Sequence, residues 1–223
     1  MEIVIRENTI NIRNNEDLFT DYYLNELVDL FINLSDRTYV ATFIRSMFYL
    51  ESDDEYYETY LDYSSVFKFQ TEDFLKVYNI FHEWDTLKNY PISRWKGLFL
   101  ELLTYKLLIK TRDNIQIKRE SEIIIKDFRT NPIDFTVKIK REYHCYECKF
   151  SSQVIKKNQI DNLLGITNYS HFKAYLILFE PMVDVKYKIS NSQLNYMLND
   201  KNKDKITLIT LENFSDNNPF LKE

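Results

Sequence analysis

The chain has 223 residues, enough for one domain with an elaboration or for two small domains. Hydrophobic residues make up 44% of it, which suffices for a substantial core, and the formal net charge of -5 argues against binding nucleic acid by bulk positive charge alone. Because no apolar run approaches the roughly 20 residues that span a bilayer and no secretory segment is visible, we expect a cytoplasmic protein without a membrane partner.

The first part of the chain predicts mostly helices. The alternation of apolar and polar residues over 2–13, with a break at Glu7–Thr9, predicts a short hairpin. A helix is expected from Asn15 to about Leu34, and another over Thr71–Lys88. Residues 38–50 have apolar side chains at both odd and even positions, so a buried strand and a helix both remain open there.

The stretch 51–63 is acidic and rich in tyrosine, and we expect a solvated element or loop. Its tyrosines are expected to pack against a domain edge rather than to stack on bases, because the neighbouring acids repel phosphate. Asn89–Tyr90–Pro91 is the strongest turn signal of the first half. We therefore predict a boundary there, between an N-terminal α+β domain over residues 1–90 and a second domain over residues 91–223.

The second domain is predicted to be an α/β (α+β) unit with a mixed sheet. A helix capped by Ser93 is expected from Arg94 to about Lys110. The remaining expected elements are strands over Ile115–Lys118 and Glu122–Lys126, strands over Ile133–Ile139 and Glu142–Phe150, a helix over 151–167, a buried strand over Lys173–Glu180, a helix near Ser192–Leu198 and a strand over Lys205–Leu211. The order is α-β-β-β-α-β with additions.

A concentration of charge lies on the two strands that flank Lys140–Arg141. If the chain turns there, Asp134 faces Glu147 at a Cβ separation of roughly 5 Å, with Lys149 one step along on the same face. Two carboxylates at that range oppose joint ionisation unless a cation or a proton intervenes. A divalent metal site is the interpretation that we favour. The alternative is a surface charge cluster, worth at most about 1 kcal/mol per pair.

Two other features need a reason. Glu101 interrupts an otherwise apolar helical stretch and has the small residues Gly97 and Thr104 as neighbours, which suggests close approach to another group. Taken alone, however, the residue is better explained as a partly exposed glutamate. Cys145 and Cys148 form a C-x-x-C pair. Because positions i and i+3 of a strand point to opposite faces, we expect neither a shared metal nor a disulfide.

Taken together, these residues resemble the PD-(D/E)xK nuclease superfamily, which has the restriction-endonuclease-like fold. The pattern consists of Glu101 on a helix, Asp134 near the start of one strand and Glu147-Cys148-Lys149 on the next. Pro132-Ile133-Asp134 is a Pro-x-Asp variant of the Pro-Asp dipeptide of the family. The resemblance covers about residues 91–180. The family often adds a glutamine on the following helix, where Gln159 is the nearest match and Gln153 the second.

The resemblance implies an endonuclease of the restriction or defence type, which hydrolyses DNA phosphodiester bonds. Asp134, Glu147 and the backbone carbonyl of Cys148 would bind Mg²⁺ or Mn²⁺, and Glu101 would join them through water or a second ion. The ion would activate a water molecule, and Lys149 would orient that water or contact the scissile phosphate.

Partners follow from the same resemblance. DNA is the expected substrate and RNA an open alternative, and double-strand cleavage would call for a homodimer or two successive events. A hypothesis from another class is a catalytically inactive binding or assembly module within a larger complex, which suits the acidic balance of the chain.

Overall fold

The computed structural model of the chain describes residues 2–87, 91–111, 115–215 and 218–220. The strands are β1 (Ile3–Glu7), β2 (Ile117–Ile125), β3 (Phe128–Arg129), β4 (Ile133–Ile139), β5 (Glu142–Lys149), β6 (Phe172–Leu178) and β7 (Ile206–Ile209). The α-helices are α1 (Thr9–Phe19), α2 (Tyr22–Asn33), α3 (Thr38–Met47), α4 (Asp53–Val66), α5 (Thr71–Leu87), α6 (Ile92–Ile109), α7 (Lys157–Ile166), α8 (Met182–Ser190) and α9 (Leu211–Ser215). Short 3₁₀ turns are η1 (Lys68–Gln70), η2 (Ser152–Val154) and η3 (Asn195–Leu198).

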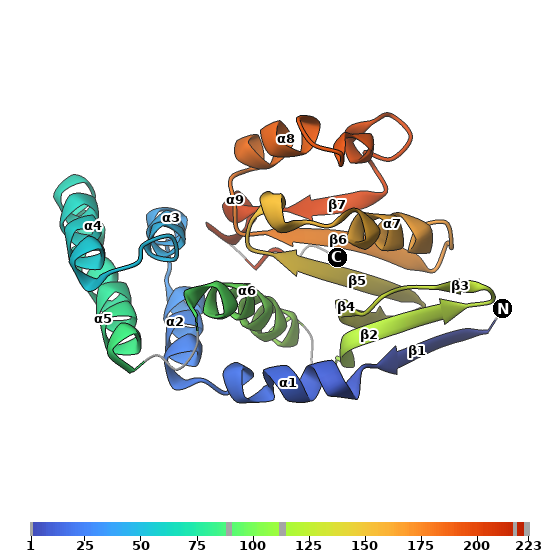
Figure 1. The fold of residues 1–223 in the computed structure, drawn as a ribbon, viewed down its shortest axis with the longest axis horizontal. Helices are drawn as coiled ribbons and strands as arrows, with labels where there is room; N and C mark the ends of the chain where they lie inside the picture. The colour runs from blue at the N-terminus through green and yellow to red at the C-terminus, as the bar shows by residue number, and fades with distance from the viewer. Residues whose placement is uncertain (1, 88–90, 112–114, 216–217, 221–223) are drawn as a thin grey trace.

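A seven-stranded mixed sheet forms the centre of the fold, in the order β1-β2-β4-β5-β6-β7 with β3 beside β2. The strands from β1 to β5 pair antiparallel, whereas β5, β6 and β7 run parallel. Helices α1 to α6 gather at one side of the molecule, and α7 and α8 lie by the parallel part of the sheet (Figure 1). The expected fold class, α/β with a helical N-terminal part, is confirmed.

Two apolar clusters fill the space on either side of the sheet. The larger one joins α2, α3, α5 and α6 to residues of β4, β5 and β6 such as Phe135, Tyr146 and Ile177. The smaller one places α7 and α8 against the other side chains of the same strands, such as Cys145 and Leu176. Among the helices described, none is long and apolar enough to cross a membrane.

The N-terminal part differs from the expectation in three places. The predicted hairpin over residues 2–13 is wrong: β1 is its only strand, because Asn8 accepts hydrogen bonds from the backbone N–H groups of Ile10 and Asn11 and starts α1. The helix predicted from Asn15 to Leu34 is two helices. Asp21 separates them, since its carboxylate accepts from Leu24 N at 2.7 Å and caps α2.

Residues 38–50, where a strand and a helix both remained open, form α3. Residues 51–63, for which a solvated element or loop was expected, form most of α4. Ser52 and Glu55 form a capping box at the start of α4, and Tyr56 is buried in the larger cluster. The helix predicted over Thr71–Lys88 corresponds to α5, and Lys88 lies outside the described residues. Most of the boundary signal at residues 89–91 also lies outside the described residues. The division into two domains therefore stays a prediction.

The second part follows the expected order closely. Helix α6 begins at Ile92, so the predicted Ser93 cap is wrong: Ser93 lies inside the helix, and Pro91 precedes it without a side-chain cap bond. Strand β2 joins the two short β-type runs into one strand. The helix predicted over 151–167 is interrupted, because Ile155 and Lys156 are extended between η2 and α7. The predicted helix near Ser192–Leu198 is only the 3₁₀ turn η3, and α8 and α9 were not anticipated.

Candidate metal-binding and catalytic site

The hairpin of β4 and β5 has the predicted register. The turn at Lys140–Arg141 pairs Ile139 with Glu142, and the ladder continues to Phe135 opposite Tyr146. One step further, the Asp134 carboxylate takes the place of a ladder bond and accepts from Cys148 N at 2.6 Å. Asp134 and Glu147 are both buried, with relative exposures of 9% and 3%. The hairpin therefore brings two carboxylates into a place that water reaches poorly.

The ammonium of Lys149 lies among the oxygens of this hairpin. Its Nζ is 2.7 Å from Glu147 Oε1, 2.8 Å from the Cys148 carbonyl oxygen and 3.5 Å from Asp134 Oδ2. Burial lowers the pKa of Lys149, but the charges of Asp134 and Glu147 outweigh it, so that the pKa is raised and the group stays protonated. Three oxygens thus converge on one cation.

Gln159 lies where the sequence suggested, at the start of the helix after β5. Its Nε2 donates to Glu147 Oε1 at 2.6 Å, while its Oε1 accepts from Lys156 N at 2.9 Å. The side chain is held at both ends, so it fixes the orientation of the Glu147 carboxylate. Gln153, the second match, is exposed and lines a neighbouring cavity instead.

Glu101 approaches the same cluster from α6. Burial raises the pKa of its carboxyl well above the usual value, and the charge of Asp134 raises it further while Lys149 opposes. Burial and Asp134 likewise raise the pKa of Glu147, to about 8. In the described part of the chain, no hydrogen bond or ion pair joins Glu101 to another side chain. Three acids therefore share one lysine, an arrangement short of positive charge.

Sequence reasoning missed Glu120, which also belongs to this cluster. Burial raises the pKa of Glu120, followed by the charge of Asp134, and its Oε2 accepts from Asn11 Nδ2 at 3.1 Å. Its φ of 44° is left-handed, a conformation that costs free energy for a residue with a Cβ. Glu120 lies in the gap between the β-type runs Ile115–Lys118 and Glu122–Lys126, and nothing in that gap indicates its left-handed conformation.

The ligand atoms gathered here are chemically suited to a hard divalent cation. Asp134 Oδ2, Glu147 Oε1 and the Cys148 carbonyl are oxygen ligands of the kind that Mg²⁺ and Mn²⁺ prefer, and all three already face a single positive charge. As the side chains stand, no three His, Cys, Asp or Glu residues of the described chain are grouped so that they could hold a metal. An ion would need Lys149 to move aside.

A cavity of about 380 Å³ opens beside the cluster. Glu101, Lys149 and the Cys148 segment line it, together with Lys96 and Tyr49. The ammonium of Lys96 lies 3.9 Å from the centre of the Tyr49 ring and 5.3 Å from that of Phe150. Gly97 also borders the cavity, and a Cβ there would meet nothing within 4 Å. The close approach suggested for Gly97 is therefore not found.

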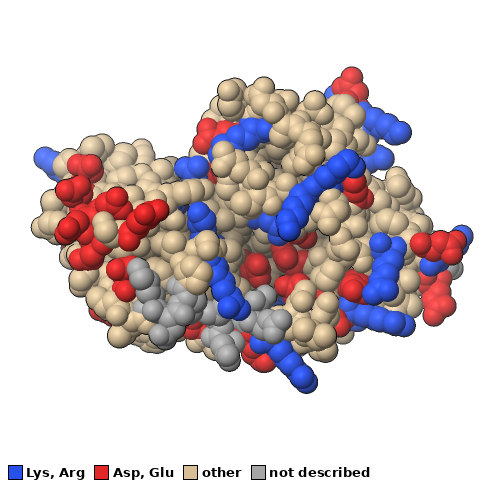
Figure 2. All heavy atoms as spheres, viewed as in Figure 1, with Lys and Arg blue, Asp and Glu red and all other residues tan. Residues whose placement is uncertain are grey.

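The surface is hollowed near the middle of the molecule. Figure 2 shows acidic side chains at the bottom of a depression near the middle of the molecule, with basic side chains at its rim. A separate acidic patch covers the helical end around α4. The two cysteines are free and buried, and burial raises the pKa of both thiols.

No protein-family model and no curated protein sequence matches the chain. Among solved structures, protein VC1899 from Vibrio cholerae is similar over 96% of this chain and 56% of its own length, at 12% identity and a TM-score of 0.46. Can2 from Sulfobacillus thermosulfidooxidans, in complex with cyclic tetra-adenylate, is similar over 52% of this chain and 33% of its own, at 18% identity and a TM-score of 0.33. The chain spans about half the length of VC1899 and a third of that of Can2.

Proposed function

We propose that the chain is a metal-dependent nuclease of the PD-(D/E)xK type that hydrolyses DNA phosphodiester bonds as an endonuclease. The observation that carries the proposal is the convergence of Asp134, Glu147 and the Cys148 carbonyl on one cation, beside a cavity that Glu101 faces. Buried acids in this number destabilise a fold unless they serve a positively charged ligand.

In this proposal Asp134, Glu147 and the Cys148 carbonyl hold Mg²⁺ or Mn²⁺. When bound, the ion supplies a water of lowered pKa and neutralises charge on the phosphate. Lys149, displaced from the oxygens, would donate to the attacking water or to a phosphate oxygen. Gln159 keeps Glu147 in position through its amide, and Glu101 accepts a hydrogen bond from water in the cavity.

The cavity supplies the means of binding the substrate. Lys96 presents an ammonium to it, and that charge attracts an anionic substrate, although burial followed by the charge of Arg45 lowers the pKa of the group. Tyr49, 49% exposed, offers an aromatic surface beside it. Because Tyr49 comes from the segment after α3, residues 1–90 take part in substrate recognition in this proposal.

A cleavage assay tests the proposal. Purified protein is incubated with supercoiled plasmid and Mg²⁺ or Mn²⁺, beside Asp134→Ala, Lys149→Ala and the surface control Lys186→Met. The wild type and the control are expected to nick the plasmid, and the two site variants to lose at least about a hundredfold in rate. Equal nicking by all four proteins would point to contamination and remove the assignment. Matched DNA and RNA oligonucleotides decide the substrate, and light scattering decides the proposed homodimer.

An inactive binding or assembly module is the second candidate. The observation that favours it is Lys149, which already pairs with both Asp134 and Glu147. Calorimetry with Mn²⁺ separates the two candidates. The nuclease requires saturable binding that Asp134→Ala abolishes, whereas absence of heat up to millimolar Mn²⁺ supports the module.

A further inference from the structure

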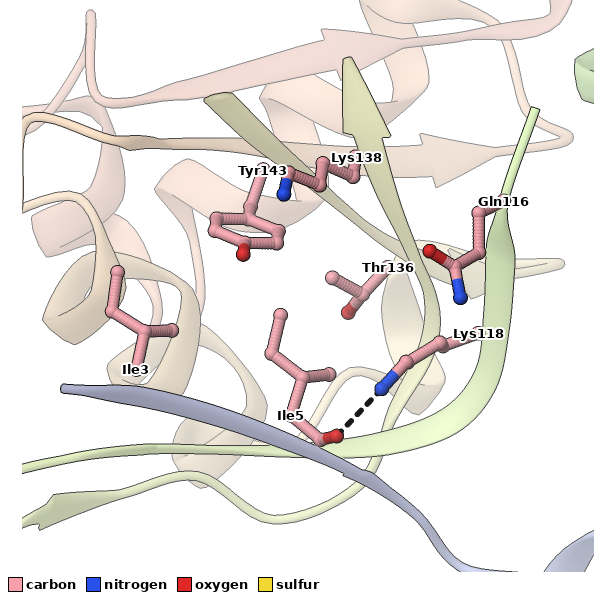
Figure 3. Close-up of a pocket in the computed structure, with 7 residues that line it drawn as sticks. All are labelled: Ile3, Ile5, Gln116, Lys118, Thr136, Lys138 and Tyr143. Atoms are coloured by element: carbon pink, nitrogen blue, oxygen red, sulfur yellow. Dashed lines mark hydrogen bonds between the residues drawn. The ribbon is translucent and has the colours of Figure 1, made fainter. Parts of the chain in front are cut away.

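A second pocket, of about 190 Å³, lies on the sheet away from the carboxylates. It is lined by residues of four neighbouring strands and the segment before β2: Ile3, Ile5, Gln116, Lys118, Thr136, Lys138 and Tyr143 (Figure 3). We call it the strand-end pocket. Lys138 is four residues beyond Asp134 on β4, about 13 Å along the strand. Between the two positions lies the buried pair of Ser121 and Thr136, whose hydroxyls are 2.6 Å apart. The pocket is thus separate from the candidate metal site.

Register explains why these side chains meet. Lys118 pairs with Thr136 across β2 and β4, and Lys138 pairs with Tyr143 across β4 and β5. Continuing the first ladder by one pair places Gln116 beside Lys138. Because alternate residues of a strand share a face, both lysines, the amide and the phenol lie on the same side of the sheet. In Figure 3 they surround a common hollow, and Ile3 and Ile5 of β1 close it on another side.

The positive charge of the pocket is not compensated locally. Lys118 Nζ donates to the Ile5 carbonyl at 2.8 Å, which uses one of its three protons, and Lys138 Nζ lies 5.8 Å from the centre of the Tyr143 ring. Within the described ranges, no carboxylate pairs with either ammonium. Two lysines left facing one hollow, in a chain of net charge -5, favour an anionic ligand over a solvated basic face.

The shape and chemistry of the lining narrow the ligand class. Lysine ammonium groups act as point charges and suit a tetrahedral oxyanion, and the Tyr143 hydroxyl and Gln116 amide add neutral donors. The isoleucine side chains and the tyrosine ring face the same space, so an apolar group attached to the anion gains contact there. We propose that the strand-end pocket binds a phosphate monoester, with Lys118 and Lys138 on the phosphoryl group and Ile3, Ile5 and the Tyr143 ring on its organic part.

Calorimetric titration in EDTA tests this assignment independently of any nuclease activity. The probes are AMP, inorganic phosphate and adenosine, because they separate the charge from the organic group. AMP is expected to bind most tightly, inorganic phosphate more weakly and adenosine least, and the affinity for AMP should fall as salt rises. Adenosine binding as tightly as AMP would overturn the role of the lysines.

Variants locate the binding. Lys138→Met, at an exposed position that leaves the fold intact, and Lys118→Met are each expected to weaken AMP binding about tenfold or more. Tyr143→Phe keeps the ring, which stacks on Phe172 at 5.2 Å between centres, and removes only the hydroxyl, so a smaller loss is expected. Lys186→Met, which removes an exposed charge from α8, should bind as the wild type does.

Two outcomes would overturn the proposal. The first is unchanged AMP affinity in both Lys118→Met and Lys138→Met. The second is loss of affinity in Lys149→Met, which would place the ligand at the carboxylate cluster instead. The proposed nuclease activity stands or falls separately, because it is measured with Mg²⁺ on plasmid DNA and without AMP.

Discussion

At the scale of single residues, the fully buried carboxylate of Glu180 organises the chain behind the candidate site. It accepts hydrogen bonds from Ser152 N at 2.9 Å and Ser152 Oγ at 2.7 Å, and it pairs with Lys188 and with Arg45 at 3.5 Å. It thereby ties α3 and α8 to the segment that follows Lys149. Burial alone would raise the pKa of Glu180, but these donors together lower it below the usual 4.5.

This lowered pKa predicts acid sensitivity. The unfolded chain takes up a proton at Glu180 at a higher pH than the folded chain does, so the contribution of Glu180 to stability is present above about pH 4.5 and is lost as the pH falls further. Glu180→Gln should lower the free energy of unfolding by about 1–3 kcal/mol at pH 7. Urea unfolding from pH 7 down to 3 should show the difference between the two proteins shrinking. A constant difference would contradict the assignment.

Lys96 offers a residue-scale prediction for the proposed nuclease. Lys96→Met keeps the apolar stem that lies on Tyr49 and Phe150 but removes the charge that faces the cavity. We expect KM for DNA to rise about tenfold while Mn²⁺ binding stays unchanged. Steady-state cleavage and Mn²⁺ calorimetry on the same variant measure the two effects. A rise in KM together with lost Mn²⁺ affinity would mean that Lys96 acts on the fold of the site instead.

Residue positions within the site could be predicted to different degrees. The two-residue turn fixes which residues of β4 and β5 face one another, so the proximity of Asp134, Glu147 and Lys149 follows from the sequence pattern. The place of Gln159 in the site was predicted from the resemblance to the nuclease superfamily. Glu120 did not, because its contribution depends on a left-handed φ that the sequence does not announce. The convergence of backbone and carboxylate oxygens on Lys149 is likewise a tertiary property.

At the scale of secondary-structure elements, helices with an apolar stripe were predictable, as α5 and α6 illustrate. The exceptions have identifiable causes. The alternation in Thr9–Arg13 imitates a strand, yet the Asn8 cap makes it the first turn of α1. The acids of residues 51–63 suggested a solvated stretch, whereas they occupy the first turn and outer face of α4 while Tyr56 reaches the core.

The 2 glycines of the chain lie in two different helices and predict opposite effects of one substitution. Gly97 in α6 has open space where a Cβ would be, so Gly97→Ala should raise the free energy of unfolding by about 0.5–1 kcal/mol. At Gly165 in α7 a Cβ would lie 2.5 Å from two ring atoms of Phe128, so Gly165→Ala should lower the free energy of unfolding by about 1–3 kcal/mol. Urea unfolding of the two variants measures both changes in the free energy of unfolding. Shifts of the same sign would refute the packing of Phe128 on α7.

At the scale of the whole molecule, one apolar cluster joins the N-terminal helices to the sheet. Trp84 of α5 stacks on Trp95 of α6 with ring centres 4.5 Å apart and planes 6° from parallel. The contact bridges the boundary predicted near residue 90, and strand β1 adds a second connection by pairing with β2. Whatever the evolutionary division of the chain, its two parts share a core.

This shared core predicts that both parts unfold together. Tryptophan fluorescence reports on the α5–α6 contact, and hydrogen exchange of peptides from β5 and β6 reports on the sheet. Both probes should give the same urea midpoint for the wild type. Val77→Ala, which truncates a buried α5 side chain, should lower both midpoints equally. Separated midpoints would show that the helical part and the sheet are independent folding units.

The pairing of β1 with β2 also has a consequence for biosynthesis. Ile3 pairs with Ile125, so β1 waits for its neighbour β2 until more than a hundred further residues have been made. During that interval the helical segments can contact one another locally, whereas β1 offers an unpaired edge. The exposed charged residues Arg6 and Glu7 follow its three apolar residues, which limits pairing with other nascent chains. Completion of the sheet, and with it the placing of Glu120 beside Asp134, is therefore a late event in the life of each newly made chain.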